Sequence, residues 1–141
     1  MIEHIDNPQL FVGKLNNLLK SGGLLFIMTI NSNSLIYRIA RVLKKVGMRV
    51  AYDRLYSIHH LQHFTNQSLK TLLEMNNFEV LVHKNHNYPL KAVDVPESNF
   101  LIQKMYKFFV LLSFLASAPF GMGIHQTIVC RKADMHKNEN K

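Results

Sequence analysis

The chain has 141 residues, a length that suits one domain able to bury roughly two thirds of its unfolded surface. Hydrophobic residues make up 48% and charged residues 18%, with only 6 Gly and 4 Pro, which excludes disordered, collagen-like and proline-rich chains. The single cysteine, Cys130, excludes an internal disulfide and a cysteine-based zinc site. We therefore expect a folded, cytoplasmic protein.

The charge is strongly basic, with 17 Lys and Arg against 9 Asp and Glu, a formal net charge of +8. This balance favours acidic partners: phosphate groups, anionic lipid headgroups or nucleic acid. Nucleic acid is the least favoured, because no recognition motif is present and the basic residues gather mainly on one predicted helix. The first residues lack the basic segment of a signal peptide, so secretion is not expected.

The amino-terminal part alternates helix and strand. Pro8 follows the cap-like Asp6 and Asn7 and begins a predicted helix over residues 8–20, which the glycines at 22 and 23 end. Residues 24–30 (LLFIMTI) are a continuous apolar run, which predicts a strand covered on both faces in a parallel sheet. An α/β architecture follows.

Residues 31–34 (NSNS) form a turn at the carboxyl end of that strand, where open α/β sheets bind their ligands. A basic amphipathic helix is predicted over residues 35–49. The stretch 53–64 is rich in aromatic and imidazole groups without a clean period, and we interpret it as a functional loop.

The second half begins with a helix that Thr65 caps and that runs to Met75. Residues 78–84 alternate in the manner of a half-exposed strand, and residues 100–118 predict a strongly apolar helix. Residues 124–132 predict a terminal strand that runs antiparallel to its neighbours, because no room remains for another crossover. We expect the tail, residues 133–141, to be disordered.

Four segments in this order carry a resemblance to a known family. They are residues 3–8 (EHIDNP), 18–25 (LLKSGGLL), 60–80 (which opens HLQHFT and closes NFEV) and 121–132 (GMGIHQTIVCRK). Together they resemble the carboxyl-terminal half of a class I, Rossmann-like S-adenosylmethionine-dependent methyltransferase. The group that includes the ubiquinone-biosynthesis O-methyltransferases is the one they resemble. Ser21, His59 and Asn77 depart from the family pattern.

The resemblance implies half of a Rossmann-like sheet: one parallel strand, an antiparallel terminal strand pair and helices. Residues 1–132 would be the partial methyltransferase domain, with helical insertions at about 35–50 and 100–118. The family's glycine-rich cofactor loop and ribose-binding acid precede the matched region, so we expect poor S-adenosylmethionine binding by the chain alone. A truncated reading frame or a partner chain that supplies the amino-terminal half would account for this.

The resemblance also implies site residues. Glu3 and His4 would lie beside the methionine part of the cofactor, with His4 as general base; a hydrogen-bonded turn is the alternative interpretation of this pair. His60, His63 and Phe64 would form a lid over the pocket for a small acceptor. Asn31 and Tyr56 complete the predicted pocket, and His4, His60 and His63 are the catalytic candidates.

His59, His60 and His63 have spacings that place side chains on one helix face, as in some metal sites. No cysteine or acid lies in register with them except Asp53, and the family pattern accounts for two of the three. We therefore assign no metal.

A membrane contact is a further expectation. Arg38, Arg41 and Lys45 would hold anionic headgroups while apolar residues of the 100–118 helix (Phe108, Phe109, Leu112 and Leu115) enter the acyl boundary. Pro119, Gly121 and Gly123 interrupt the apolar run, which favours a buried or interfacial helix over a membrane span. Two alternatives stay open: the helix packs on protein, or the half-fold is a non-catalytic membrane-surface or regulatory module.

Overall fold

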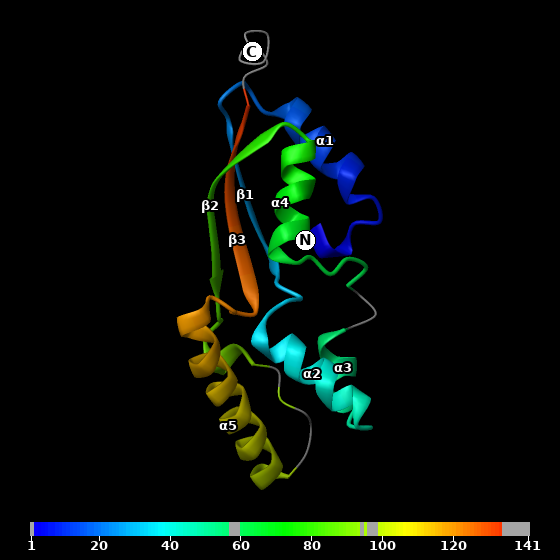
Figure 1. Ribbon diagram of the computed structural model, residues 1–141, viewed down its shortest axis with the longest axis vertical. Coiled ribbons are helices and arrows are strands. Elements are labelled where there is room, and N and C mark those ends of the chain that lie inside the picture. The colour runs from blue at the N-terminus through cyan, green and yellow to red at the C-terminus, as the bar shows by residue number, and fades with distance from the viewer. Residues whose placement is uncertain (1, 57–59, 94, 96–98, 134–141) are drawn as a thin grey trace.

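A computed structural model describes residues 2–56, 60–93, 95 and 99–133 of the chain (Figure 1). The helices are α1 (Pro8–Leu18), α2 (Leu35–Lys45), α3 (Val50–Leu55), α4 (Asn66–Met75) and α5 (Phe100–Ser117). The strands are β1 (Leu24–Ile30), β2 (Phe78–His86) and β3 (His125–Lys132). Three short 3₁₀ turns are η1 (Ile2–His4), η2 (Leu90–Ala92) and η3 (Ala118–Phe120).

The three strands form one sheet in the order β1-β3-β2. The last strand lies between the other two and pairs antiparallel with both, with Ile27 opposite Ile128 and Phe78 opposite Lys132. The predicted antiparallel terminal strand is confirmed. Strands β1 and β2 run in the same direction, so the carboxyl ends of both lie at one end of the sheet, beside α2 and α5 (Figure 1).

Strand β2 carries a β-bulge that the sequence pattern did not predict. Val80 pairs with Cys130 and Val82 with Val129, so Leu81 is the extra residue. The bulge reverses the alternation, and as a result Val82 is exposed while His83 is half-buried and lies 3.1 Å from the Gln126 amide oxygen.

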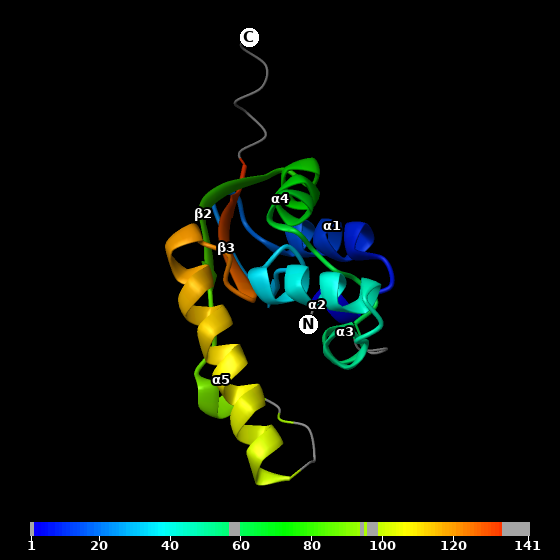
Figure 2. The same cartoon turned by 60° about the horizontal axis from the view of Figure 1, so that its bottom comes forward.

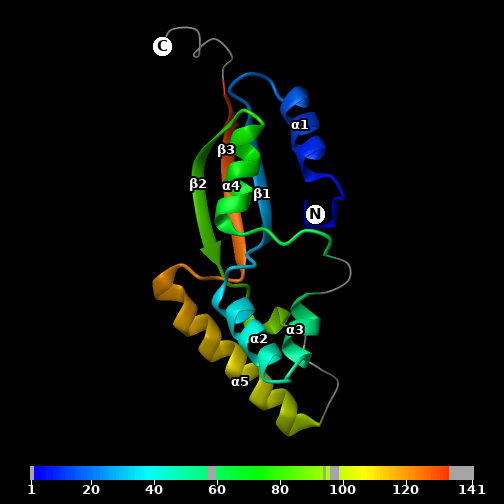
Figure 3. The same cartoon turned by 45° about the vertical axis from the view of Figure 1, so that its right-hand side comes forward.

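Helices α1 and α4 both lie on the same face of the sheet (Figures 1 and 3). Their buried side chains pack with the inner residues of the strands; this core comprises Ile2, Val12, Ile27, Phe64, Leu69, Leu73, Phe78, Ile128 and Cys130. The prediction that β1 is covered on both faces is wrong for the described residues. Leu24, Phe26 and Met28 point to the uncovered face and are 61%, 64% and 54% exposed.

A second apolar cluster lies beyond the carboxyl ends of β1 and β2. It joins α2 and α5 to the segment before β3 and contains Tyr37, Val93, Val110, Phe114 and Ile124. Helix α5 extends from this cluster away from the sheet (Figure 2). Most of α5 is exposed, because only its Val110, Phe114 and Ser117 are buried.

The ends of the elements follow capping chemistry. Thr65 accepts a hydrogen bond from the Ser68 amide while the Ser68 hydroxyl accepts one from the Thr65 amide, a reciprocal cap that begins α4 as predicted. After α4, Asn77 adopts a left-handed φ of 58°, the conformation that glycine favours. Residues 53–55, which were predicted to begin a loop, are instead the end of α3, and α1 ends two residues before the predicted end.

A crowded corner joins β2 to β3. A Cβ atom at Gly123 would lie 2.6 Å from the backbone atoms of His86, so only glycine permits this approach. The rings of His86 and His125 lie next to each other, with centroids 5.8 Å apart, and the Tyr88 ring lies 5.2 Å from that of His125. Burial, and then the neighbouring His86, lower the pKa of His125 below its usual value.

Gly123→Ala is expected to lower the free energy of unfolding by about 1–3 kcal/mol, because the new methyl group meets backbone that cannot rotate away. Chemical denaturation followed by circular dichroism measures the effect. Gly13→Ala in α1 is the matched control: its Cβ meets only the Asn76 side chain, at 3.3 Å, and alanine favours the helix by up to about 1 kcal/mol. Equal losses in both variants would contradict the role given to Gly123.

The lowered pKa of His125 predicts a pH-dependent stability. Above the unfolded pKa, near 6.5, both states keep His125 neutral and its contribution is fully present. As the pH falls below that value the unfolded state binds a proton that the folded state resists, so the free energy of unfolding falls. Urea titrations at several pH values test this, and His125→Gln is expected to flatten the dependence; an unchanged slope would contradict the assignment.

Candidate functional site

Polar side chains gather at the carboxyl end of β1, where η1 and the segment 60–65 meet. The backbone amide of Gln62 donates a hydrogen bond of 2.9 Å to the Glu3 carbonyl oxygen, and the Ser32 amide donates one of 2.9 Å to the Phe64 carbonyl oxygen. These bonds hold η1 and the segment 60–65, which are almost sixty residues apart in sequence, against the carboxyl end of β1. The position agrees with the predicted place of a ligand site in an open α/β sheet.

Glu3 and His4 form the first part of the site. The Thr29 hydroxyl donates a hydrogen bond of 2.7 Å to Glu3 Oε2, and His4 Nε2 lies 3.6 Å from Glu3 Oε1. Burial acts to raise the pKa of Glu3, but hydrogen bonds to its carboxylate, one of them from Thr29, outweigh that effect and hold the pKa below its usual value. The site therefore contains a fixed negative charge beside an imidazole that is 47% exposed.

His60 and His63 form the second part. The His60 ring lies 5.1 Å from that of His4 and 6.2 Å from that of His63, measured between centroids. Within the described residues, His60 Nδ1 and His63 Nε2 are buried and have no hydrogen-bond partner. A buried polar atom without a partner costs free energy, so both atoms are suited to meet a ligand. Burial, and then His60, lower the pKa of His63.

Stacked aromatic rings extend the site toward α2 and α3. The Tyr56 ring stacks on His63 at 4.6 Å and on Tyr52 at 4.2 Å, and Tyr37 meets Tyr56 edge-on at 5.1 Å. Burial raises the pKa of Tyr37, whose hydroxyl donates a hydrogen bond to the Leu55 carbonyl oxygen. Of these tyrosines the sequence singled out Tyr56 alone, although the spacing of Tyr52 and Tyr56 on a helix was a visible signal.

Two further residues of the predicted pocket, Phe64 and Asn31, lie inside the fold. Phe64 is buried in the core, and the Asn31 side chain donates a hydrogen bond of 3.1 Å to the Gly123 carbonyl oxygen. Two residues that sequence reasoning missed, Thr29 and Gln126, are buried polar groups within strands. For Thr29 the signal was a polar residue in an otherwise apolar strand, where a buried partner is required; β3 contains several polar residues, so Gln126 gave no such signal.

The three basic residues that were predicted to hold anionic headgroups make different contacts in the structure. Arg41 donates hydrogen bonds of 2.9 Å to the Ser32 carbonyl oxygen and to the Tyr56 hydroxyl, so it braces the site from inside. Arg38 donates one to the Asn33 carbonyl oxygen from an exposed position, and Lys45 is exposed at the end of α2. His59 lies outside the described residues.

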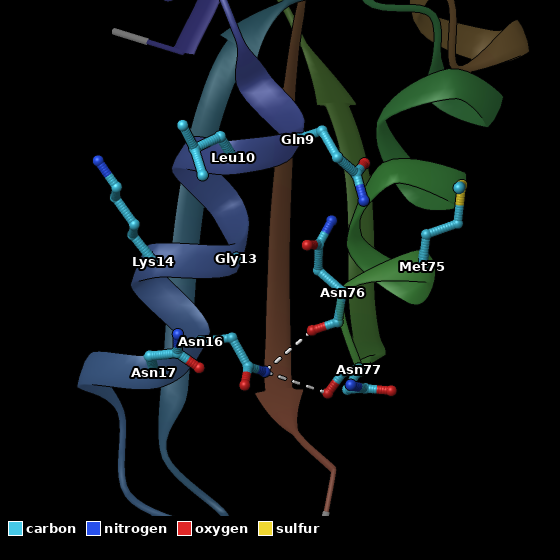
Figure 4. Close-up of a pocket in the computed structure, with 9 residues that line it drawn as sticks. All are labelled: Gln9, Leu10, Gly13, Lys14, Asn16, Asn17, Met75, Asn76 and Asn77. Carbon is cyan, nitrogen blue, oxygen red and sulfur yellow. Dashed lines mark hydrogen bonds between the residues drawn. The ribbon is translucent and has the colours of Figure 1, made fainter.

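A polar groove between α1 and α4, with a volume of about 410 Å³, is a second concavity (Figure 4). The Asn16 amide points across it and donates hydrogen bonds to the carbonyl oxygens of Asn76, at 2.9 Å, and Asn77, at 3.5 Å. These carbonyls end α4, so the asparagine satisfies helix-terminal groups. The groove is accounted for by folding and carries no chemistry.

Comparisons with known proteins agree with the fold. A profile of the methyltransferase domain family matches residues 1–83. The mitochondrial ubiquinone biosynthesis O-methyltransferase of Dictyostelium discoideum is 32% identical over 81 residues, which are 57% of this chain and 24% of that protein.

Two solved structures share the fold. The first is an S-adenosylmethionine-dependent methyltransferase of Thermotoga maritima described as a possible histamine N-methyltransferase. It has a TM-score of 0.54 and 18% identity over 93% of this chain and 51% of its own. The second is a methyltransferase of the same cofactor type from Archaeoglobus fulgidus, with a TM-score of 0.51 and 16% identity over 94% and 56%. The chain therefore spans about a quarter of the curated relative and about half of each solved structure.

Proposed function

Because the chain belongs to the methyltransferase domain family, we propose that it forms the acceptor-side half of an S-adenosylmethionine-dependent methyltransferase that acts on a small, lipid-soluble acceptor. The observation that carries this proposal is the cluster at the carboxyl end of β1. There His60 Nδ1 and His63 Nε2 are buried next to the Glu3 and His4 pair, and neither atom has a hydrogen-bond partner in the described part of the chain. Such atoms suit the hydroxyl or amine of an acceptor.

The chain's own residues orient the acceptor and accept its proton. His63, whose lowered pKa keeps it neutral near pH 7, offers a nitrogen that accepts a hydrogen bond. His4 is the general base in this proposal, because its imidazole is 47% exposed and lies 3.6 Å from the Glu3 carboxylate and beside the His60 ring. The stacked rings of Tyr56 and His63 provide a flat surface against which a planar acceptor packs.

The described residues do not by themselves fit S-adenosylmethionine. The turn from β1 into α2 is Asn-Ser-Asn-Ser and has no glycine that would let a ligand approach the helix N-terminus closely. The backbone of His86 fills the space beside Gly123, and Gly121 ends a short 3₁₀ turn before β3. We therefore place the main contacts of the cofactor on another polypeptide segment.

The uncovered face of β1 is where that segment would dock. β1 is an edge strand of the sheet, and its exposed Leu24, Phe26 and Met28 form an apolar row on a face that no described element covers. An unpaired strand edge offers backbone hydrogen bonds to another strand. The partner in this proposal is the cofactor-binding half of the same fold, either in a separate chain or in a longer form of this one.

Calorimetric titration with S-adenosylhomocysteine tests the half-fold proposal. The chain alone is expected to bind more weakly than about 1 mM. A fusion to the part of the Dictyostelium relative that precedes the matched segment is expected to bind measurably. In the fusion, Phe26→Lys is expected to abolish binding by blocking the interface, while Leu18→Lys, at another exposed leucine on α1, leaves it unchanged. Tight binding by the chain alone, or equal effects of both variants, would contradict the proposal.

Contact with a membrane surface is the second part of the proposal. Residues 100–120 are the one helical segment, among the described residues, that is long and apolar enough to cross a membrane, and only 17% of an apolar stretch of 18 residues within it is buried. Helices α2, α3 and α5 enclose an apolar cavity of about 520 Å³. We place α5 against the surface of a cytoplasmic membrane, with the cavity receiving the apolar part of the acceptor.

The cavity is lined mainly by carbon. Its residues are Ile36, Ile39, Leu43, Met48, Ala51, Leu55, Tyr106, Phe109, Val110 and Ser113. Helix α3 ends at Leu55, next to Tyr56, so the cavity adjoins the aromatic part of the site. This continuity supports a lipid-soluble acceptor whose reactive end reaches the histidines.

Flotation with phospholipid vesicles tests the membrane contact. Binding is expected to vesicles that contain phosphatidylglycerol and to weaken as salt screens Lys45 and Arg38. Phe108→Ser is expected to reduce binding roughly tenfold by removing buried apolar area. Phe26→Ser, which removes an exposed phenylalanine from β1, is the control and is expected to have no effect. Equal loss in both variants would indicate general stickiness and contradict the contact; binding without any methyl transfer by the fusion would favour a non-catalytic membrane module.

A further inference from the structure

Arg41 reaches the candidate site from the middle of α2. Its Nη1 atom donates one hydrogen bond of 2.9 Å to the Ser32 carbonyl oxygen and another of 2.9 Å to the Tyr56 hydroxyl. Hydrogen bonds from a charged donor are stronger than those between neutral groups, and the half-buried position of Arg41 limits competition from water. Arg41 therefore ties α2 to two other segments at once: the turn that follows β1 and the end of α3.

The first connection leads from Arg41 to the ring of His63. Tyr56 lies just beyond the last residue of α3, and its ring stacks on that of His63, with 4.6 Å between the centroids and 28° between the planes. The hydrogen bond from Arg41 holds the hydroxyl end of the Tyr56 ring, so that this ring cannot tilt freely. The stack in turn fixes the plane of the His63 imidazole.

The second connection leads from Arg41 to the backbone of His63. Ser32, whose carbonyl oxygen accepts the other bond from Arg41, also donates two hydrogen bonds of its own. Its hydroxyl donates one of 3.3 Å to the His63 carbonyl oxygen, and its amide donates one of 2.9 Å to the Phe64 carbonyl oxygen. The two connections therefore end at one residue, the first at its ring and the second at its backbone.

From this geometry we propose that Arg41 is a positioning residue of the site, which fixes the imidazole of His63 through Tyr56 and Ser32. The purpose of this orientation rests on the proposed function, in which His63 accepts a hydrogen bond from the acceptor; the positioning itself does not. A group that orients a reacting molecule must be held closely, because a misplacement of about 1 Å can cost roughly a hundredfold in rate. In this role Arg41 acts only through other residues and does not contact the acceptor.

The sequence did not distinguish Arg41 from Arg38 and Lys45, and all three were predicted to hold anionic headgroups. They lie on one basic amphipathic helix, and its periodicity does not show which basic side chain turns toward the protein. In the structure Arg41 is half-buried and bonded to the site, whereas Arg38 and Lys45 are exposed. The deciding partner, Tyr56, comes 15 residues later in the chain.

Proton NMR of the full chain tests the proposal. A stacked tyrosine ring shifts the signals of neighbouring ring protons upfield, so the C–H signals of His63 report on its stack with Tyr56. His63→Gln identifies these signals among those of the 8 histidines. Tyr56→Phe keeps the ring and removes only the hydroxyl that Arg41 holds, and it is expected to lose the upfield shift, as is Arg41→Gln. The double variant is expected to lose no more than either single one, because both changes break the same bond.

Two matched controls remove similar groups that belong to neither connection. Tyr37→Phe removes a neighbouring tyrosine hydroxyl, which donates to the Leu55 carbonyl oxygen, and Arg38→Gln removes the arginine one turn earlier in α2, which donates to the Asn33 carbonyl oxygen. Both controls are expected to keep the upfield shift of His63.

Circular dichroism establishes that each variant is folded, and Tyr56→Phe, which removes a single oxygen atom, remains informative if Arg41→Gln unfolds. A His63 signal that keeps its upfield shift in folded Tyr56→Phe, or that loses it equally in Tyr37→Phe, would overturn the proposal. Absence of the shift from the unaltered chain would overturn it as well.

These spectra are recorded without cofactor or acceptor. A negative result therefore leaves the methyltransferase proposal standing, and failure of the S-adenosylhomocysteine experiment leaves the positioning of His63 by Arg41 standing.

Discussion

The buried amide of Gln126 is the interaction on which the site depends. This side chain is fully buried in β3 and donates hydrogen bonds to the carbonyl oxygens of Ile30, at 3.0 Å, and Phe64, at 3.1 Å. It thereby joins the end of β1 to the segment that carries His60 and His63. Replacing it with an apolar residue would remove a donor from each of two carbonyl oxygens inside the protein, although that of Phe64 would keep its hydrogen bond from the Ser32 amide. The last strand, β3, thus positions site residues that come from the beginning and the middle of the sequence.

Much of the local structure could be predicted because it depends on neighbours in sequence. Thr65 caps α4 and Asn77 adopts a left-handed conformation for reasons visible in a few residues. The bulge at Leu81 could not be predicted, because it arises from pairing with β3, nearly fifty residues away. The exposure of Phe26 could not either, since an apolar run is the same whether its second face is covered or open.

The candidate site likewise contains residues that could be predicted from the sequence and residues that could not. His4, His60 and His63 followed from the order of family-like segments, and the structure places their rings next to one another. The roles of Thr29 and Gln126 depend on tertiary hydrogen bonds, and the sequence indicates only that a polar residue sits in a strand. Residues that position a site are harder to predict than residues that face it, because their hydrogen-bond partners lie in distant segments of the chain.

The apolar row on β1 and the exposed face of α5 differ in whether their backbone groups still need hydrogen-bond partners. The row on β1 lies on an edge strand whose backbone groups still need hydrogen-bond partners, and the hydrocarbon of a membrane cannot supply them. Helix α5 satisfies its own backbone and exposes Phe108, Phe109 and Leu112 near basic side chains, a combination that hydrocarbon and anionic headgroups accept. This difference in backbone requirements supports the proposal that another polypeptide covers the sheet face and that α5 contacts lipid. Since α5 extends away from the sheet (Figure 2), a chain docked on β1 would leave much of α5 free to contact a membrane.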